Sequence, residues 1–269
     1  GFAIWDFASK NMLLGIYGTQ LYRMDKSSLG TPDGAWDAIG GGSSWDSYTK
    51  LMLHCDGVDA ATTFTDEIGK TVTANGNAQI DTAQKKFGTA SGLFDGTGDY
   101  LSIPDSDDWY FDGAFTIDFW VRFNAIPNEV IPLVGQYQDT NHFWNLEMRD
   151  ATSIRLYQAN AGNNEINVVS AWTPIVNTWY HLAVVRQAAG GTWVIYVNGA
   201  SLGTVTDIDN FINFAGTLRI GYKEDDVKYF NGWIDELRIS KGIARWTANF
   251  TPPTAAYSAD AIAITSSRY

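Results

Sequence analysis

Cysteine is almost absent from this chain. Cys55 is the single cysteine among 269 residues, which excludes an internal disulfide and a zinc site built on cysteines. No apolar run approaches the roughly 18 residues that a membrane-spanning helix needs, so we expect no membrane insertion. The chain begins with Gly1 rather than methionine, and no charged and then apolar leader follows. We therefore expect a processed chain or a segment of a longer protein.

Positive charge is also scarce. The chain has 18 lysines and arginines against 30 aspartates and glutamates, and its formal net charge is −12. A field of this sign repels phosphate backbones, so nucleic acid is excluded as a partner, whereas divalent cations and neutral ligands remain compatible with it. An acidic surface that only keeps the protein in solution is an equally good reading of most of these carboxylates.

Helical periodicity is nearly missing, and short alternating runs take its place. In FTIDFWVRF, residues 115–123, every second side chain is apolar, which is typical of a strand with one buried face. WVIYVNGASLG predicts a hairpin that turns at Asn198 and Gly199. About a dozen such strands separated by glycine-rich corners predict an all-β fold, a two-sheet antiparallel sandwich or jelly roll.

The distribution of strand-like runs and turn residues divides the chain into three parts. Residues 1–47 contain two short β-like runs and end in the linker-like GGGSSWDS; they form one hairpin or so, too little for a core of their own. Residues 48–257 have the uniform strand-and-turn pattern of one domain. Residues 258–269 are small and polar, a tail or an extra strand. We expect residues 1–47 to anchor the chain to other subunits or to further copies of itself, because unpaired strand edges accept additional strands.

Six motifs in order resemble a known family. They are ASGLFDGTGDYLSIPDS, GAFTIDFWVRF, NTWYHLAVVR, TWVIYVNGASLG, GTLRIGY and FNGWIDELRIS. Their order and spacing resemble a LamG-like, concanavalin A-like jelly roll over roughly residues 50–257. The segment FTDEIGKTVTANGNAQIDTAQKKFGTASGLFDGTGDY and the ending ISKGIARWTANFTPPT are similar to the variant common in bacteriophage structural and tail proteins. The resemblance implies a two-sheet sandwich used mainly for binding glycans or proteins, often with a structural calcium ion.

The last motif raises a question about Asp235. In strict alternation Asp235 shares a face with Trp233, Leu237 and Ile239, and a carboxylate buried there needs a partner or a metal ion. By the resemblance, a calcium ion held by Asp66 and Asp235 joins the first and last strand regions, and glycines close to both residues allow backbone carbonyls to turn toward a cation. The alternatives are a buried Asp235 that accepts backbone N–H groups, or an inward-facing Ile234 that leaves Asp235 in water.

Glycan binding needs a flat ring for stacking and polar groups that reach hydroxyls. Two stretches offer both, and we expect them at strand ends or loops on a sheet rim. The candidate residues are Gln136, Tyr137, Asn141, His142 and Trp144 in the first stretch, and Tyr222, Asp225 and Tyr229 in the second. Aromatic residues in sandwiches more often pack in the core, and Trp144 in particular fits that alternative.

Catalytic patterns are weak. Hydrolases of this fold carry a Glu-x-Asp-x-x-Glu strand, which the chain lacks; Asp235 and Glu236 are neighbours that point to opposite faces, and Glu147 stands alone. A lyase set of His142, Tyr157, Arg155 and Gln136 has suitable residue types only. We therefore expect no enzyme, and predict a virion-surface or extracellular adhesion module that binds cell-surface carbohydrate. A purely structural virion protein without a glycan site, or a carbohydrate-active enzyme, are the alternatives.

Overall fold

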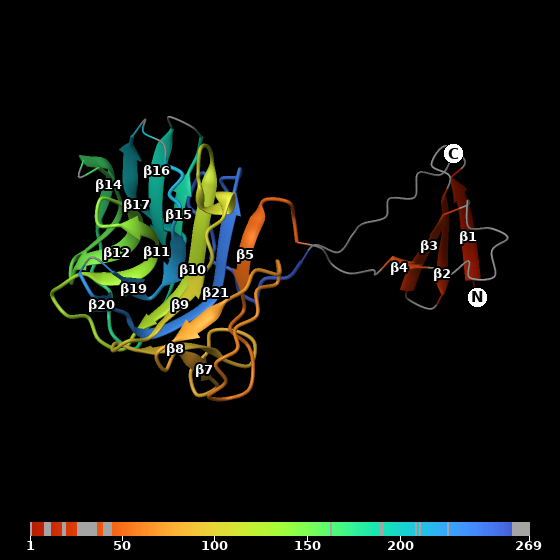
Figure 1. Ribbon diagram of the computed structural model, residues 1–269, viewed down its shortest axis with the longest axis horizontal. Coiled ribbons are helices and arrows are strands. Elements are labelled where there is room, and N and C mark those ends of the chain that lie inside the picture. The colour runs from red at the N-terminus through yellow and green to blue at the C-terminus, as the bar shows by residue number, and fades with distance from the viewer. Residues whose placement is uncertain are drawn as a thin grey trace. The chain divides into compact units, whose positions relative to one another are not determined.

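The computed structural model of the chain describes strands at 2–7, 12–17, 20–25 and 37–39, and then residues 45–259 apart from 162, 189, 190, 208, 210 and 225. The chain divides into two compact units (Figure 1): residues 47–257 form one, and residues 1–46 with 258–269 form the other. Within the described residues, no helix is long and apolar enough to cross a membrane.

The N-terminal unit contains a four-stranded antiparallel sheet. Its strands follow one another in chain order: β1 (Phe2–Phe7), β2 (Met12–Tyr17), β3 (Gln20–Asp25) and β4 (Asp37–Ile39). The sequence predicted about one hairpin here, which is fewer strands than the structure has. β1 pairs along its full length with β2, and β4 extends the sheet beyond β3.

Residues 47–257 form a sandwich of two antiparallel sheets, as the alternation and the resemblance predicted. One sheet, which we call the β10 sheet, has the order β17 (Ala200–Thr206), β16 (Thr192–Val197), β15 (Trp179–Arg186), β10 (Phe115–Phe123), β21 (Asn231–Lys241), β8 (Ser91–Asp95) and β7 (Gln79–Asp81), with β5 (Thr49–Leu53) also paired to β21. The other, the β11 sheet, has the order β14 (Asn163–Ala171), β13 (Ser153–Asn160), β12 (His142–Asp150), β11 (Ile131–Asp139), β18 (Thr217–Ile220), β9 (Tyr100–Ile103) and β6 (Thr73–Asn75). A short ribbon of β19 (Tyr222–Lys223) and β20 (Lys228–Tyr229) lies against β11.

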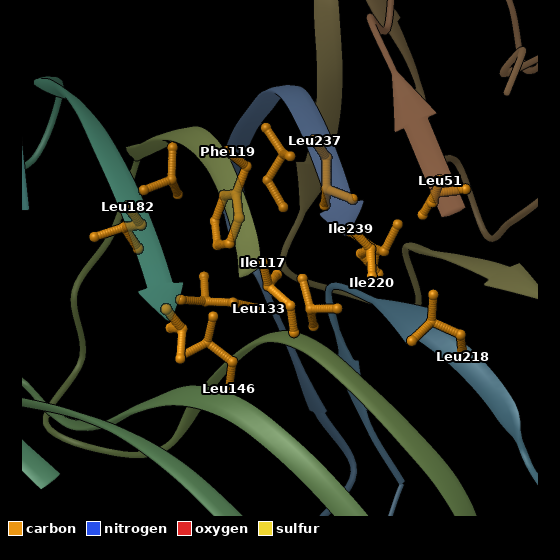
Figure 2. Close-up of a cluster of buried hydrophobic side chains, with 14 of the residues drawn as sticks. Leu51, Ile117, Phe119, Leu133, Leu146, Leu182, Leu218, Ile220, Leu237 and Ile239 are labelled. Carbon is orange, nitrogen blue, oxygen red and sulfur yellow. The ribbon is translucent and has the colours of Figure 1, made fainter. Parts of the chain in front are cut away.

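The core fills the space between the two sheets. Phe115, Ile117, Phe119, Val121 and Phe123, the apolar positions of FTIDFWVRF, are all fully buried there. Figure 2 shows Ile117, Phe119, Leu182, Leu237 and Ile239 of the β10 sheet directed toward Leu133, Leu146, Leu218 and Ile220 of the β11 sheet. The predicted alternation of β10 is therefore confirmed, and its other residues lie on the outer face of the sheet.

A β-bulge at Glu236 answers the question about Asp235. Glu236 has a positive φ of 52°, and the register of β21 against β10 shifts at this point. The extra residue lets both Ile234 and Leu237 enter the core, which strict alternation forbids. Asp235 therefore lies on the outer face of the sheet. It is nevertheless fully buried rather than in water, because other segments cover this face.

The predicted turn at Asn198 and Gly199 is present, and both residues have positive φ angles, 49° and 77°. The turn also holds the segment that follows β21. Residues 242–257, which we call the strap, cross the outer face of the β10 sheet, where Trp246 and Phe250 pack on Ala183, Val185, Val194 and Tyr196. The backbone N–H of Phe250 donates to the carbonyl of Gly199 at 2.9 Å.

Candidate functional site

The two stretches with glycan-binding candidates come together on the outer face of the β11 sheet. Tyr137 on β11 pairs with Phe143 on β12, and Tyr222 pairs with Tyr229 in the β19–β20 ribbon. The guanidinium carbon of Arg219 joins them, 5.3 Å from the ring centres of both Tyr137 and Tyr222. We call this surface the tyrosine face; it consists of Tyr100, Tyr137, Phe143, Tyr157, Tyr222 and Tyr229, with Arg155, Arg219 and Lys223.

Tyr222 is the middle ring of a stack. Its ring centre lies 4.7 Å from that of Tyr100 and 4.7 Å from that of Tyr229, at interplanar angles of 30° and 16°. Burial, with a smaller contribution from Tyr229, raises the pKa of its hydroxyl to about 12. Tyr222 therefore supports the stack, whereas Tyr229 at its end also lines a cavity of about 150 Å³ together with Glu129 and Asn231.

Each cation of the tyrosine face has a carboxylate partner. Arg155 Nε donates to Glu147 Oε1 at 2.6 Å, and Lys223 Nζ donates to Asp226 Oδ2 at 2.7 Å. Arg219 pairs with Glu224. These pairs cancel the positive charge locally, so the surface offers rings and hydrogen-bonding groups without a strong preference for anions.

Gln136 and Trp144 do not belong to this surface, which corrects the expectation for both. Trp144 is fully buried in the core between the sheets. Its indole Nε1 donates to Gln136 Oε1 at 3.2 Å, and Gln136 Nε2 in turn donates to the carbonyl of Phe214 at 2.7 Å. The pair is on the inner face because Gln136 and Trp144 are register partners, one residue away from the outward pair of Tyr137 and Phe143.

The turn between β11 and β12 holds the remaining candidates of the first stretch. Asn141 is exposed, and its N–H donates to Asp139 Oδ1 at 2.9 Å. His142 is half-buried, and its Nδ1 lies 2.8 Å from Asp139 Oδ1. Both side chains are near the rim of the β11 sheet, as expected for this stretch. Asp225, from the second stretch, lies outside the described residues.

The two residues expected to share a calcium ion each accept their own backbone N–H groups. The register places Asp66 beside Leu53 of β5, and β5 in turn separates it from β21, which carries Asp235. The carboxylate of Asp66 accepts the N–H groups of Met52 and Lys70, both at 2.8 Å. Within the described residues, no group of three or more His, Cys, Asp or Glu side chains could hold a metal ion.

Asp235 instead has the bonding of a buried carboxylate that accepts backbone groups. Its Oδ2 accepts the N–H groups of Lys86 and Phe87 at 2.7 and 3.1 Å, which was one of the alternatives open from the sequence. Burial raises its pKa to about 7, and the nearby carboxylates of Glu236 and Asp56 contribute in the same direction. Among the described residues, Asp235 forms no ion pair that would offset the cost of burying its charge, whereas Arg238 provides one for Asp118 on the neighbouring strand.

A second buried cluster lies under the strap, and the sequence analysis missed it. Asp118, fully buried, receives Nε and Nη2 of Arg238 at 3.1 and 3.2 Å. The hydroxyl of Tyr257 donates to the same carboxylate and lies 3.1 Å from His181 Nε2. Although burial opposes the charge, Arg238 and then His181 lower the pKa of Asp118 to about 2. The alternation of FTIDFWVRF placed Asp118 on the outer face but gave no sign of the strap.

The carboxylates considered for catalysis lie on two different sheets. Asp235 and Glu236 lie on the covered outer face of the β10 sheet, and Glu236 bonds to His54 at 2.8 Å and to the N–H of Tyr257 at 2.7 Å. Glu147 is on the opposite sheet, in an ion pair with Arg155. Of the possible lyase set, Gln136 faces the core and is separated from Arg155 and Tyr157 by the sheet itself.

Sequence comparison decides the family. Residues 95–245, more than half of the chain, match the family described as concanavalin A-like lectin/glucanases superfamily. The chain belongs to this superfamily. The match covers most of the six motifs, from the last residue of β8 to the start of the strap. A comparison with curated protein sequences gives no match.

Solved structures of the same fold include binding domains. Domain 4 of an extracellular arabinanase from Geobacillus stearothermophilus, solved with arabinotriose, is 19% identical, with a TM-score of 0.54 and coverage of 74% of this chain and 95% of that chain. The binding domain of botulinum neurotoxin DC, in complex with rat synaptotagmin II, is 16% identical, with a TM-score of 0.56 and coverage of 73% and 49%. A botulinum neurotoxin type C structure, described with two ganglioside molecules, has 16% identity, a TM-score of 0.55 and coverage of 73% and 48%. The chain thus spans about half of the toxin domains, and the likeness at this identity shows the fold.

Proposed function

We propose that this protein is a non-catalytic adhesion module that binds cell-surface carbohydrate through the tyrosine face. One observation carries the proposal: two stretches distant in sequence converge on the uncovered outer face of the β11 sheet and supply rings beside hydrogen-bonding groups. Tyr137, Tyr157 and Tyr229 are half-buried, so part of each ring remains open to a ligand. The arabinotriose-bound arabinanase domain and the ganglioside-associated neurotoxin support the choice of a glycan ligand.

The affinity of one such site is expected to be low. A ring stacked on a sugar contributes roughly 0.5 to 1.5 kcal/mol beyond the burial of area, by analogy with aromatic pairs. Binding then becomes useful through many copies, because linked sites convert later binding steps into local ones. A virion surface supplies such copies. The similarity of FTDEIGKTVTANG and ISKGIARWTANFTPPT to bacteriophage structural and tail proteins supports this placement, at the virion surface or another extracellular location.

The N-terminal unit is proposed to attach the sandwich to other virion subunits or to further copies of the chain. β1 and β4 are the edges of its sheet, each pairing with one neighbour among the described strands, and an open edge accepts a strand from another chain. Chemical cross-linking of the full chain, followed by mass spectrometry, should give links between copies or to subunits that involve residues 1–47. If all links from this segment stay within one chain, the attachment role is wrong.

The glycan proposal is tested by displaying the full chain in multivalent form on a glycan array and on host cells. Tyr137→Ala and Tyr229→Ala remove open rings from the tyrosine face and should reduce binding severalfold. Tyr48→Ala serves as the matched control, because Tyr48 is an exposed tyrosine, 43% accessible, that precedes β5 of the other sheet. Circular dichroism and melting confirm that each variant is folded.

Three outcomes separate the possible functions. Selective loss of binding in the Tyr137 and Tyr229 variants supports the proposal. Equal binding by these folded variants and the wild type removes the tyrosine face as the site. If the wild type binds neither glycans nor host cells, a structural decoration role takes the place of adhesion. A depolymerisation assay on the glycans that bind covers the enzymatic alternative, for which the structure offers no paired carboxylates on the described part of the tyrosine face.

A further inference from the structure

A row of half-buried side chains crosses the part of the outer face of the β10 sheet that the strap leaves open. Trp179 on β15, Arg122 on β10 and Trp233 on β21 are direct register partners. Leu93 on β8 follows Trp233 in the same row. All four side chains are partly accessible. Directly opposite residues have Cβ atoms about 5 Å apart, so Arg122 lies between two indoles on a continuous surface. We call it the tryptophan row.

Arg122 is held by stacking rather than by an ion pair. Its guanidinium carbon lies 4.7 Å from the ring centre of Trp233. Trp233 is fixed in turn, since its indole Nε1 donates to Asp81 Oδ2 at 2.6 Å. In the described part of the chain, no carboxylate lies within 4.0 Å of the Arg122 guanidinium, and none of the described hydrogen bonds uses its donors. A guanidinium stacked on an indole keeps its N–H groups directed outward from the ring, available to an oxygen ligand.

This lack of a carboxylate partner distinguishes Arg122 from three other arginines of the sandwich. Carboxylates outnumber basic groups by 30 to 18, and Arg155, Arg219 and Arg238 each have one. A second cation nearby shares the feature. Lys86 Nζ lies 4.0 Å from the ring centre of Trp120, one row along β10 from Arg122, and forms no ion pair with a described carboxylate. Two cations that form no ion pair with a described carboxylate, each placed on an indole, thus lie on the same face of this sheet.

We propose that the tryptophan row is a second binding site, specific for an acidic saccharide that carries a carboxylate. The exposed indole surface suits the apolar face of a sugar ring. The fork of N–H donors on Arg122 suits a carboxylate, which it binds through two parallel hydrogen bonds. The net charge of −12 does not prevent this, because in physiological salt charges more than about 8 Å away are largely screened. Asp81, the carboxylate next to Trp233, already accepts the N–H of that indole.

The site is independent of the tyrosine face. The two surfaces lie on the outer faces of different sheets, and the cations of the tyrosine face are all paired with carboxylates. The two sites therefore differ in the charge of the ligand they accept. Loss of the glycan site through Tyr137→Ala leaves the tryptophan row intact, so each proposal can fail without the other.

The probe is tetragalacturonate, with its fully methyl-esterified form as the uncharged counterpart of the same shape. The ¹⁵N-labelled full chain is titrated with each, and the indole N–H signals of its 11 tryptophans are followed by NMR. Trp179→Phe and Trp233→Phe assign the two relevant signals. We expect the acid to shift these two signals. The ester should bind at least roughly tenfold more weakly than the acid, because a hydrogen bond to a charged group is worth about 1.5 kcal/mol or more.

Two arginine variants complete the test. Arg122→Gln should weaken tetragalacturonate binding by roughly tenfold, and Arg122→Lys, which keeps the charge but loses the fork, should lie between it and the wild type. Arg149→Gln is the matched control, since Arg149 is an exposed arginine on β12 of the other sheet. The proposal is overturned if acid and ester bind equally, if folded Arg122→Gln binds like the wild type, or if neither tryptophan signal moves.

Discussion

The outer faces of the two sheets carry similar residues but differ in what covers them. On the β10 sheet, the strap and the loop before β8 bury Asp118, His181, Asp235 and Glu236. On the β11 sheet, the short β19–β20 ribbon lies against β11, and the tyrosine rings of the tyrosine face stay partly accessible. Polar residues on an outward sheet face therefore do not indicate a binding site by themselves. The segment that crosses the face decides between a structural network and a surface for ligands.

The largest expected effect comes from breaking the network under the strap. Asp118→Ala leaves Arg238, 8% accessible, without its carboxylate and removes the acceptor of the Tyr257 hydroxyl. Removing one member of a buried ion pair costs about 3–5 kcal/mol, so the free energy of unfolding measured in urea should fall by that amount. Glu67→Ala, at an exposed position, is the control and should change it little. A loss below about 1 kcal/mol for Asp118→Ala contradicts the assignment of Asp118 as a structural group.

The next effect separates two aspartates on the covered face by their response to pH. The pKa of Asp235 is raised from 3.8 to about 7, so the folded state holds a proton that the unfolded state releases. Stability from this group is therefore complete below pH 4 and is lost as the pH rises through 7, by an amount on the order of 2–4 kcal/mol. The pKa of Asp118 is lowered to about 2, so its contribution is present above pH 4 and is lost as the pH falls toward 2.

Unfolding free energies measured from pH 3 to pH 9 test this difference. Asp235→Asn removes the titrating group and should flatten the decline between pH 4 and pH 8. An unchanged slope in the Asn variant assigns the pH dependence to another group, of which His54, whose pKa is raised by its bond to Glu236, is the first to examine. His54 acts in the same direction, because its stabilisation is also lost as the pH rises.

Much of the fold follows from sequence rules that act over short distances. The apolar alternation of residues 115–123 and the Asn198–Gly199 turn were predicted because strand faces and two-residue turns depend on neighbouring residues. The bulge at Glu236 was not, since nothing in FNGWIDELRIS separates an inserted residue from regular alternation. Trp144 could have been assigned to the core, because it alternates with Leu146 and Met148, which are buried beside it.

The sequence predicted individual residues of the candidate site but not which of them lie together. Tyr137 and Tyr222 were both selected for their residue types and polar neighbours, but their meeting across Arg219 depends on pairing between β11 and β18, which is distant in sequence. The expectation of calcium at Asp66 and Asp235 stays a prediction, and it depends in the same way on which segments become neighbours. Each residue lies near a glycine, as required, but the strand order puts β5 between them. Residue type and local geometry do not report which segments become neighbours.

A smaller effect is expected where the strap meets the β16–β17 turn. A Cβ atom at Gly199 would lie 1.8 Å from the carbonyl oxygen of Phe250 and would have to displace the strap. Gly203→Ala is the matched control, because Gly203 also has a positive φ, 122°, but has no atom within 4 Å of the added carbon. Gly199→Ala should therefore lower the free energy of unfolding by about 1–3 kcal/mol, and by more than Gly203→Ala. Equal losses in the two variants indicate that only backbone strain is involved and that the strap adjusts freely.

The smallest effect is expected for an ion pair on the open side of the molecule. Lys228 on β20 pairs with Glu129, and their side chains are 34% and 49% accessible. Exposed pairs of this kind contribute about 0–1 kcal/mol, because water screens both charges and two flexible side chains must be ordered. Lys228→Gln should therefore change the unfolding free energy by less than about 0.5 kcal/mol, against the several kcal/mol expected for Asp118→Ala. A loss of about 2 kcal/mol or more would mean that this ion pair holds the β19–β20 ribbon to the sandwich. The position of the rings in the tyrosine face would then depend on the ion pair rather than on ring stacking.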